Sequence, residues 1–280
     1  MSNPYKLDPG YIGGGKGALF ALHYEPATRT EQTPCVIVVP SFAEEMNRCR
    51  YMQTMLAQAI TTQGFALLAV DPFGTGDSQG EFEQASWEQW INDTVSACDH
   101  ATHLGYNQQS MLGIRLGALL AAAAAAKCDH LQQLIFWQPV TSGKVALNQF
   151  LRIKIAASIG REEEAGTTAQ FEEQLAGGNS IEVAGYDVSP ELYYGIQSAH
   201  MNNHMSLTCT PIHWFTVLAS EERKTPRGDI QVMEKWRENG ARVSHQTVIG
   251  PAFWQAHERT LAPDLITATA AHLAGDPNHE

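Results

Sequence analysis

The residues best placed to do chemistry lie in a short turn between an apolar segment and an alanine-rich one. The turn reads Gly113-Ile114-Arg115-Leu116-Gly117, with small residues on both sides of its apex, as close approach of backbone to backbone requires. The hydrophobic pattern predicts a strand over 110–114 and a helix over 116–128. Arg115 therefore stands at the apex, beside the start of a helix. A guanidinium stays protonated at ordinary pH and only donates hydrogen bonds, so it cannot attack a carbonyl carbon.

An arginine at this position needs a negative partner. The start of a helix carries partial positive charge, which disfavours an exposed cation by roughly 0.3–1 kcal/mol and a buried, unpaired one by more. The glutamates expected nearby are Glu44, Glu45, Glu221 and Glu222. Two interpretations stay open. Arg115 forms a structural ion pair with one of them, or it joins the helix N-terminus and loop amides in binding a carboxylate or phosphate of a ligand.

Strands and helices are expected to alternate around this turn. Continuous apolar runs are typical of strands buried on both faces, and the segments between them have helical periodicity. Asn47 is predicted to cap the first helix. Such alternation predicts a parallel sheet with crossover helices. The expected elements are a hairpin over 11–23, strands over 35–39, 65–70, 110–114, 134–137, 211–218 and 242–249, and helices over 47–62, 86–104, 116–128, 229–239 and from about 257 to 273.

The alternation stops after about residue 140. Residues 141–208 are polar and irregular, with glycine-rich turns at Gly177-Gly178 and Gly185. We interpret them as a mainly helical cap inserted into an α/β core formed by residues 1–140 and 209–280.

Composition and charge exclude several classes of partner. A chain of 280 residues with 44% hydrophobic and 17% charged residues is typical of one large globular domain. Its net charge of −12 argues against nucleic acid and anionic membranes. No leader peptide is expected, and the most apolar stretch, 116–126, is too short to span a bilayer, so no integral membrane segment is predicted.

Cysteine and histidine patterns predict neither disulfides nor a cofactor. The five cysteines have no regular spacing, which is typical of reduced thiols in a cytoplasmic protein. His200 and His204 are four residues apart, but no nearby carboxylate completes a catalytic zinc motif. We therefore expect no metal and no other cofactor.

This arrangement resembles the α/β-hydrolase fold. The likeness rests on the loop Asp71-Pro72-Phe73-Gly74-Thr75-Gly76-Asp77-Ser78, on the turn at Arg115 and on the late cap. Three segments, 40–47, 113–118 and 250–254, are more narrowly similar to exosortase A system-associated hydrolases, type 2, and the likeness extends over nearly the whole chain. That resemblance implies a hydrolase associated with exopolysaccharide biosynthesis and a bacterial protein-sorting system.

The resemblance also implies where a catalytic triad would stand. A serine hydrolase of this fold needs a nucleophile at the turn, an acid after a later strand and a histidine after the last strand. Arg115 takes the place of the nucleophile, and Glu221 or Glu222 falls at the acid position. Phe253 aligns with the histidine, which leaves His257, four residues later, as a displaced base. Two of three positions thus depart from the pattern.

Other nucleophiles could replace the missing serine. Ser41 lies in the loop that supplies an oxyanion-hole amide in hydrolases of this fold, and Ser78 and Ser220 lie on the same rim. Cys49 is expected inside the first helix. None has a histidine adjacent in sequence, so we interpret all four as ordinary loop or helix residues.

Two classes of function stay open. In one, the protein hydrolyses an ester, thioester or similar acyl bond of a glycan or lipid-linked precursor. In the other, it is catalytically silent and holds an anionic or acyl-bearing small molecule through Arg115 and a pocket under the cap. The residues favour the second class and the resemblance favours the first; a homodimer is compatible with either. The candidate catalytic residues are Arg115, Glu44, Glu45, Ser41, Glu221, Glu222 and His257, and the candidate pocket residues are Phe42, Leu116, Trp137, Phe253 and Trp254. For Trp137, Phe253 and Trp254, core packing is the default interpretation and pocket lining is the second.

Overall fold

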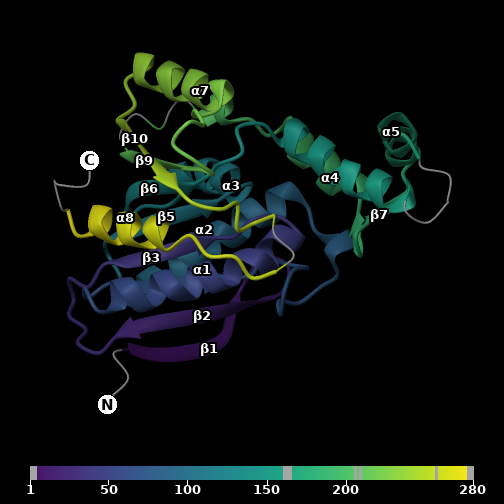
Figure 1. Ribbon diagram of the computed structural model, residues 1–280. Coiled ribbons are helices and arrows are strands. Elements are labelled where there is room, and N and C mark those ends of the chain that lie inside the picture. Colours follow the sequence, from purple (N-terminus) through teal and green to yellow (C-terminus); the bar gives the residue numbers. More distant parts are fainter. Residues whose placement is uncertain (1–4, 160–165, 205–206, 208–209, 256–257, 276–280) are drawn as a thin grey trace.

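An eight-stranded sheet forms the centre of the computed structural model, which describes residues 5–159, 166–204, 207, 210–255 and 258–275 (Figure 1). Its strand order is β1-β2-β4-β3-β5-β6-β9-β10. The hairpin β1–β2 joins the sheet antiparallel to β4, and the other strands run parallel. The predicted parallel sheet with an opening hairpin is confirmed. The strands are Tyr5–Gly13 (β1), Ala18–Pro26 (β2), Cys35–Val39 (β3), Ala66–Val70 (β4), Gln109–Ile114 (β5), Leu131–Trp137 (β6), Ile212–Leu218 (β9) and Val243–Ile249 (β10).

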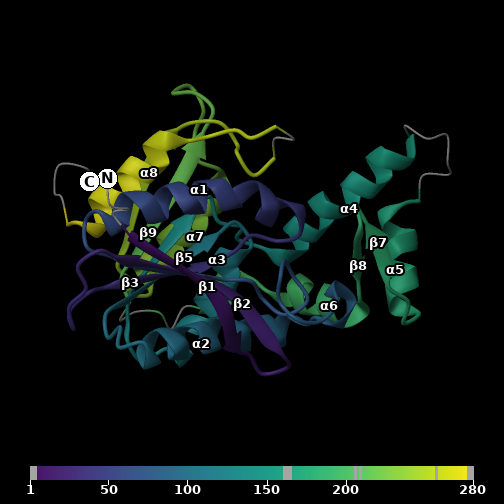
Figure 2. The ribbon, with the colours of Figure 1, turned by 90° about the horizontal axis from the view of Figure 1, so that it is seen from below.

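Helices cover both faces of the sheet (Figure 2). Alternate residues of β3 pack toward opposite faces: Ile37 joins the core cluster beneath α2 and α3, whereas Val38 joins the cluster beneath α1 and α8. This two-sided burial explains why the strands are continuous apolar runs. No helix in the described part of the chain is both long and apolar enough to cross a bilayer. The helices of the core are Glu44–Thr61 (α1), Trp87–His103 (α2), Gly117–Ala124 (α3), Arg227–Glu238 (α7) and Pro263–Leu273 (α8), with short 3₁₀ turns at Phe82–Gln84 (η1) and Ala125–Lys127 (η2).

Two helices begin three or more residues away from their predicted starts. α1 starts at Glu44, three residues before Asn47, and no side chain caps it. Acidic residues in a first turn interact favourably with the helix dipole, and that interaction replaces the expected cap. α8 starts at Pro263 rather than near 257, because proline suits the first turn, where its missing N–H is not needed.

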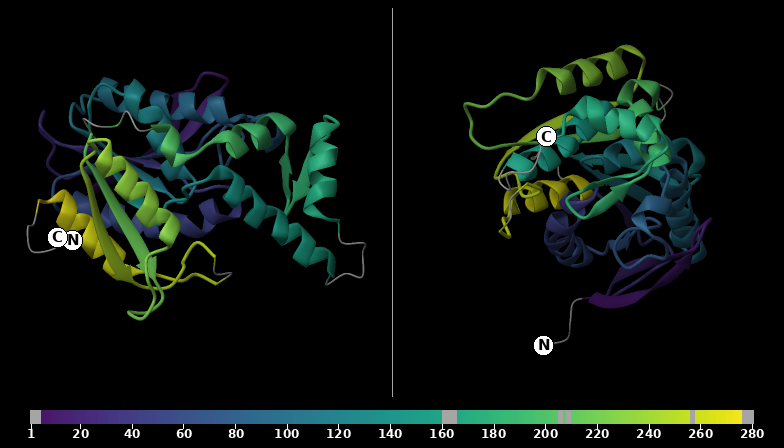
Figure 3. Two further views of the ribbon diagram at one scale, coloured as in Figure 1. Left: turned by 90° about the horizontal axis from the view of Figure 1, so that it is seen from above. Right: turned by 90° about the vertical axis from the view of Figure 1, so that its right-hand side faces the viewer.

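The segment between β6 and β9 extends away from the sheet (Figures 1 and 3). It is mainly helical, as expected, but the turn at Gly185 belongs to a small antiparallel hairpin. Gly195 of α6 packs against Trp87 of α2, where an added Cβ would lie 2.5 Å from the Trp87 side chain, and this contact fixes the cap to the core. The elements are Gly143–Ile159 (α4), Thr168–Ala176 (α5), Ile181–Val183 (β7), Tyr186–Val188 (β8), Pro190–Ser198 (α6) and Met201–His204 (η3). All lie within 141–208; the cap boundaries themselves stay a prediction.

Candidate functional site

The turn after β5 is built by two glycines and a strained apex. Arg115 has a left-handed φ of 55°, and its carbonyl accepts from the backbone N–H of Val140. A Cβ on Gly117 would lie 2.3 Å from the carbonyl oxygens of Val39 and Pro40, and one on Gly113 would lie 2.5 Å from the next helix. Only glycine permits this approach. The backbone therefore places the Arg115 side chain at the carboxyl edge of the sheet, where α3 begins.

Arg115 is held by three different groups. Its Nη1 donates to the carbonyl oxygen of Gln138 at 3.0 Å. Its Nε lies 3.3 Å from Oε2 of Glu45 and its Nη2 lies 3.4 Å from Oε1. The guanidinium carbon also stands 4.8 Å from the centroid of the Trp254 ring, a cation–π distance. The anion that faces Arg115 among the described residues is thus Glu45.

Glu45 and Glu44 point in different directions from the first turn of α1. Glu45 reaches the turn at Arg115 and keeps 29% of its side chain exposed. Glu44 instead accepts from the hydroxyl of Tyr186 in the cap hairpin, at 3.3 Å, and lies 3.8 Å from Arg48. Burial, and then the Glu44 charge, raises the pKa of Tyr186, so this contact is between a neutral phenol and a carboxylate. Glu45 therefore contacts Arg115, whereas Glu44 connects α1 to the cap hairpin.

A cavity of about 590 Å³ opens between this edge of the sheet and α4. Arg115 and Glu45 lie at its polar end, and apolar side chains of α4 form much of its wall. It also includes Glu44, Phe42, Leu116 and Trp254. The sequence named all six of these residues as site candidates without fixing their arrangement. A cavity of this volume accommodates a small organic molecule. The other lining residues are Arg48, Val140, Ala146, Gln149, Phe150, Ile153, Ala184 and Gln255.

Two backbone amides beside Arg115 have no acceptor. Within the described residues, neither the N–H of Phe42 nor that of Leu116 donates a hydrogen bond, although both residues line the cavity. Phe42 follows β3 and Leu116 follows the apex of the turn. Paired amides of this kind stabilise a negatively charged oxygen.

Three proposed catalytic side chains lie elsewhere. Ser41 is 4% exposed, and its hydroxyl has no hydrogen-bond partner among the described residues. It borders a separate void of about 10 Å³, which shares Phe42 and Leu116 with the lining of the cavity. Glu221 and Glu222 are exposed in the turn after β9 and do not line the cavity. His257 lies outside the described residues.

The aromatic residues after the last strand divide between core and cavity. Phe253 is 1% exposed and packs edge-on against Trp137, 6.3 Å between ring centroids. Trp137 in turn donates from Nε1 to Thr269 of α8. Both therefore belong to the core on the α1–α8 face, because β-strand alternation turns Trp137 away from the cap. Trp254, one residue later, is the aromatic side chain that contacts Arg115.

Two participants were not expected from the sequence. Gln138, directly after β6, has a φ of 42° and supplies the carbonyl bound by Arg115. Its position at the carboxyl end of a parallel strand was the available signal. Asp229, in the first turn of α7, is 7% exposed; burial raises its pKa to about 6, and the Arg115 charge acts in the opposite direction. No spacing in the sequence links Asp229 to Arg115.

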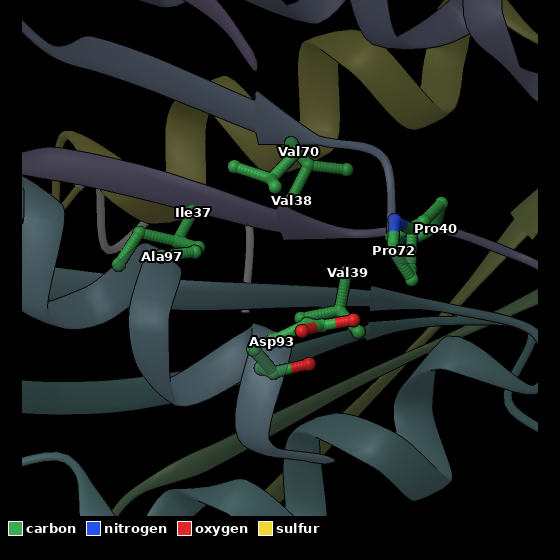
Figure 4. Close-up of a pocket in the computed structure, with 9 residues that line it drawn as sticks. Ile37, Val38, Val39, Pro40, Val70, Pro72, Asp93 and Ala97 are labelled. Atoms are coloured by element: carbon green, nitrogen blue, oxygen red, sulfur yellow. The ribbon is translucent and has the colours of Figure 1, made fainter. Parts of the chain in front are cut away.

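A second small void lies between β3, β4 and α2, where the Asp93 carboxylate approaches apolar side chains (Figure 4). Its volume is about 10 Å³, close to the minimum for a single water molecule. Asp93 accepts from the N–H of Phe73 at 2.9 Å and from Gln89 at 2.6 Å, so it fixes the loop after β4. Among the described residues, no cluster of three histidine, cysteine or acidic side chains is arranged to hold a metal.

Comparison with known proteins supports the fold assignment. The model of a family described as serine aminopeptidase, S33, matches residues 30–161, just under half of the chain. A search of curated proteins finds no match.

Solved structures of esterases superpose on nearly the whole chain. Est1E from Butyrivibrio proteoclasticus, bound to ferulic acid, has 18% identity and a TM-score of 0.66, with 97% of this chain and 100% of that chain covered. A thermostable carboxyl esterase from Bacillus coagulans has 15% identity and a TM-score of 0.63, with 98% and 99% covered. Carboxyl esterase 2 from the fungus Tuber melanosporum has 12% identity and a TM-score of 0.62, with 98% and 87% covered. The strand order, the turn at Arg115 and these superpositions together show that the chain has the α/β-hydrolase fold.

Proposed function

We propose that this protein binds an acyl-bearing ligand with an anionic group in the cavity beneath α4, and that it lacks serine-based hydrolysis. The observation that carries the proposal is Arg115, a cation in the cavity at the position of a nucleophile. The apolar wall of α4 suits an acyl chain, and the polar end suits a carboxylate or phosphate.

The ion pair with Glu45 does not use the full binding capacity of Arg115. Its N–O distances of 3.3–3.4 Å exceed the 2.7–2.9 Å of well-formed charged hydrogen bonds. A ligand carboxylate would accept hydrogen bonds from the guanidinium and also from the free backbone N–H groups of Phe42 and Leu116. The Arg115 side chain is only 11% exposed, so a ligand anion can displace Glu45 only by itself pairing with the guanidinium charge.

The origin of the ligand is the finer part of the proposal. A glycan-derived or lipid-linked acyl precursor fits the shape and polarity of the cavity. The similarity of segments 40–47, 113–118 and 250–254 to exosortase A system-associated hydrolases, type 2, supports that source.

A second candidate function, ester hydrolysis, is favoured by the position of Glu45. This carboxylate both contacts Arg115 and lines the cavity, so it can take a proton from a water molecule that attacks an acyl carbon. The amides of Phe42 and Leu116 would then stabilise the developing oxyanion. Est1E and the two carboxyl esterases act as precedents for the fold only.

Ligand titration tests the first proposal. Decanoate, decanol and decyltrimethylammonium share one chain length and differ in head-group charge. The chain has six tryptophans, so binding beside Arg115 is reported by the part of the tryptophan emission change that Trp254→Phe removes. We expect the tightest binding for decanoate. Arg115→Gln should remove that preference, whereas Arg223→Gln, an exposed arginine outside the cavity, should retain it. Equal affinity of the wild type for all three probes would contradict the proposal.

Turnover separates the two functions. The binding protein should release p-nitrophenol from p-nitrophenyl decanoate no faster than buffer, and a fluorophosphonate probe should not label it. A hydrolase that uses Glu45 would turn the ester over and lose activity in Glu45→Gln without serine labelling. Labelling that disappears in Ser41→Ala would refute both schemes.

A further inference from the structure

Two cysteines far from the cavity lie in direct contact. Cys98 belongs to α2, and Cys128 follows η2 at the end of the segment that begins with α3. Their Sγ atoms are 3.0 Å apart. Cys98 is 2% exposed, whereas Cys128 is partly exposed to solvent. The pair therefore has one inner and one accessible sulfur.

We propose that Cys98 and Cys128 form a redox-active dithiol that a hydroperoxide oxidises to a disulfide. The Cys128 thiolate attacks a peroxide oxygen, the O–O bond breaks, and sulfenic acid forms at Cys128. Hydroxide leaves from hydrogen peroxide and takes up the proton that the Cys128 thiol lost, which gives water. The Cys98 sulfur then attacks the Cys128 sulfur and displaces hydroxide, which takes the Cys98 proton to leave as a second water. The two thiols lose two electrons, and the peroxide gains them.

Formation of the Cys98–Cys128 disulfide requires little movement of the two side chains. A disulfide bond is about 2.05 Å long, so the sulfurs must approach by about 1 Å, a distance that side-chain rotation can supply. The pair lies on two elements that already pack together, α2 and the segment after α3. The bond would close a loop over 98–128 that contains β5 and the turn at Arg115.

Among the described cysteines, Cys128 is the one suited to attack peroxide first. Cys35 and Cys49 are fully buried, and burial raises the pKa of each thiol to about 12. The neighbouring Cys128 and burial likewise raise the pKa of Cys98, which assigns the first attack on peroxide to Cys128. This inference is independent of what the cavity binds.

Peptide mapping after peroxide treatment tests the pairing. The folded protein is treated with hydrogen peroxide, alkylated, denatured and digested with trypsin without reduction. We expect residues 51–115 to be linked to residues 128–144, with loss of two hydrogen atoms. Cys35, in 30–48, and Cys49, in 49–50, should remain separate and alkylatable after denaturation. The same mapping in Cys209→Ser removes the thiol that lies outside the described residues.

Single variants distinguish the two roles. Cys98→Ser should leave a sulfenic acid at Cys128 that dimedone traps, whereas Cys128→Ser should leave Cys98 unreactive until the protein unfolds. Peroxide should also raise the thermal midpoint of the wild type and not that of either variant. The proposal is overturned if both thiols can still be alkylated when the folded wild type is treated with peroxide and then denatured, or if Cys128 is found linked to Cys209.

Discussion

Arg115 combines a strained backbone with a well-supported side chain. A left-handed φ is uncommon for arginine, but the turn requires it, because the glycines on both sides admit α3 against β3. The guanidinium is stabilised by a carboxylate, a carbonyl and an indole ring, from Glu45, Gln138 and Trp254. The cation is thus accommodated by the surrounding fold, which explains how the turn can persist without a nucleophile.

Restoring a serine at the turn should not restore hydrolysis. We expect Arg115→Ser to release no p-nitrophenol above background and to resist fluorophosphonate labelling. The reason is that a serine hydroxyl needs a general base within hydrogen-bond reach, and Glu45 contacts the guanidinium of Arg115, several bonds beyond the place of a serine Oγ. Arg115→Ser combined with Trp254→His supplies an imidazole and is the matched comparison. Activity in the single variant would show that a base already reaches the turn.

His213 should make the protein less stable in mild acid. Its ring is 3% exposed, its Nδ1 lies 2.6 Å from the Ser244 hydroxyl, and it stacks on His272 at 3.8 Å. Burial, and then the His272 charge, lowers the pKa of His213 from 6.5 to about 4. The unfolded chain therefore binds more protons between these values, so stability is full above pH 6.5 and falls as the pH drops toward 4.

The size of this effect follows from the difference between the folded and unfolded pKa values of His213. That difference corresponds to a loss of about 3 kcal/mol at most in the free energy of unfolding. Urea unfolding at pH 7 and at pH 5 measures it. His213→Gln should show a smaller difference between the two pH values; an equal difference would assign the acid sensitivity to other groups.

The approach of α3 to β3 should be the least tolerant packing contact at the site. Gly117→Ala places a methyl group against the carbonyls of Val39 and Pro40, and we expect a loss of about 1–3 kcal/mol or more in the free energy of unfolding. Gly228→Ala, also near the start of a helix but with no atom within 4 Å of the new Cβ, is the control and should be neutral or slightly stabilising. Urea midpoints compare the two, and similar losses would contradict the packing argument.

α4 should control what enters the cavity. Ala146 lines the cavity, whereas its neighbour Val145 is 53% exposed and does not. We expect Ala146→Trp to weaken decanoate binding about tenfold or more, because the indole fills space needed by the chain. Val145→Trp adds the same side chain to the same helix and should leave the affinity unchanged. Equal weakening in both variants would indicate a general disturbance of the cap.

Over the whole molecule, the charged groups that interact at the site come from segments that are distant in the chain. Arg115 follows β5, Glu45 comes from α1, and Asp229 comes from α7. Burial raises the pKa of Asp229 from 3.8 to about 6 while the Arg115 charge lowers it. The folded state therefore binds more protons than the unfolded state between these values, and stability falls as the pH rises through them.

Neutralising Asp229 should stabilise the protein at neutral pH. We expect Asp229→Asn to raise the free energy of unfolding at pH 7.5 by about 1–3 kcal/mol, with the gain disappearing near pH 4, where the unfolded carboxyl also protonates. In an Arg115→Gln background the gain should increase, because the favourable charge is gone. Chemical unfolding of the four proteins forms a double-mutant cycle. Additive effects would show that Arg115 and Asp229 do not interact.

The sequence was sufficient for the order of strands and helices in the core and for the sharp turn with an arginine at its apex. Those features depend on local patterns: apolar runs, glycines at close approaches and the identity of residue 115. Where α1 begins was not available from such patterns, because an aspartate, serine or asparagine cap and an acidic first turn are competing ways to start a helix.

The partner of Arg115 depended on the folded chain. Glu44 and Glu45 are adjacent and chemically identical, and only the start of α1 at Glu44 turns one toward Arg115 and the other toward Tyr186. In the same way, strand alternation turns Trp137 into the core, where Phe253 packs against it, while Trp254 lines the cavity. The residue types determined that the positive charge at this turn needs stabilising partners. The direction of each side chain, fixed by helix phase and strand alternation in three dimensions, decided which residues supply it.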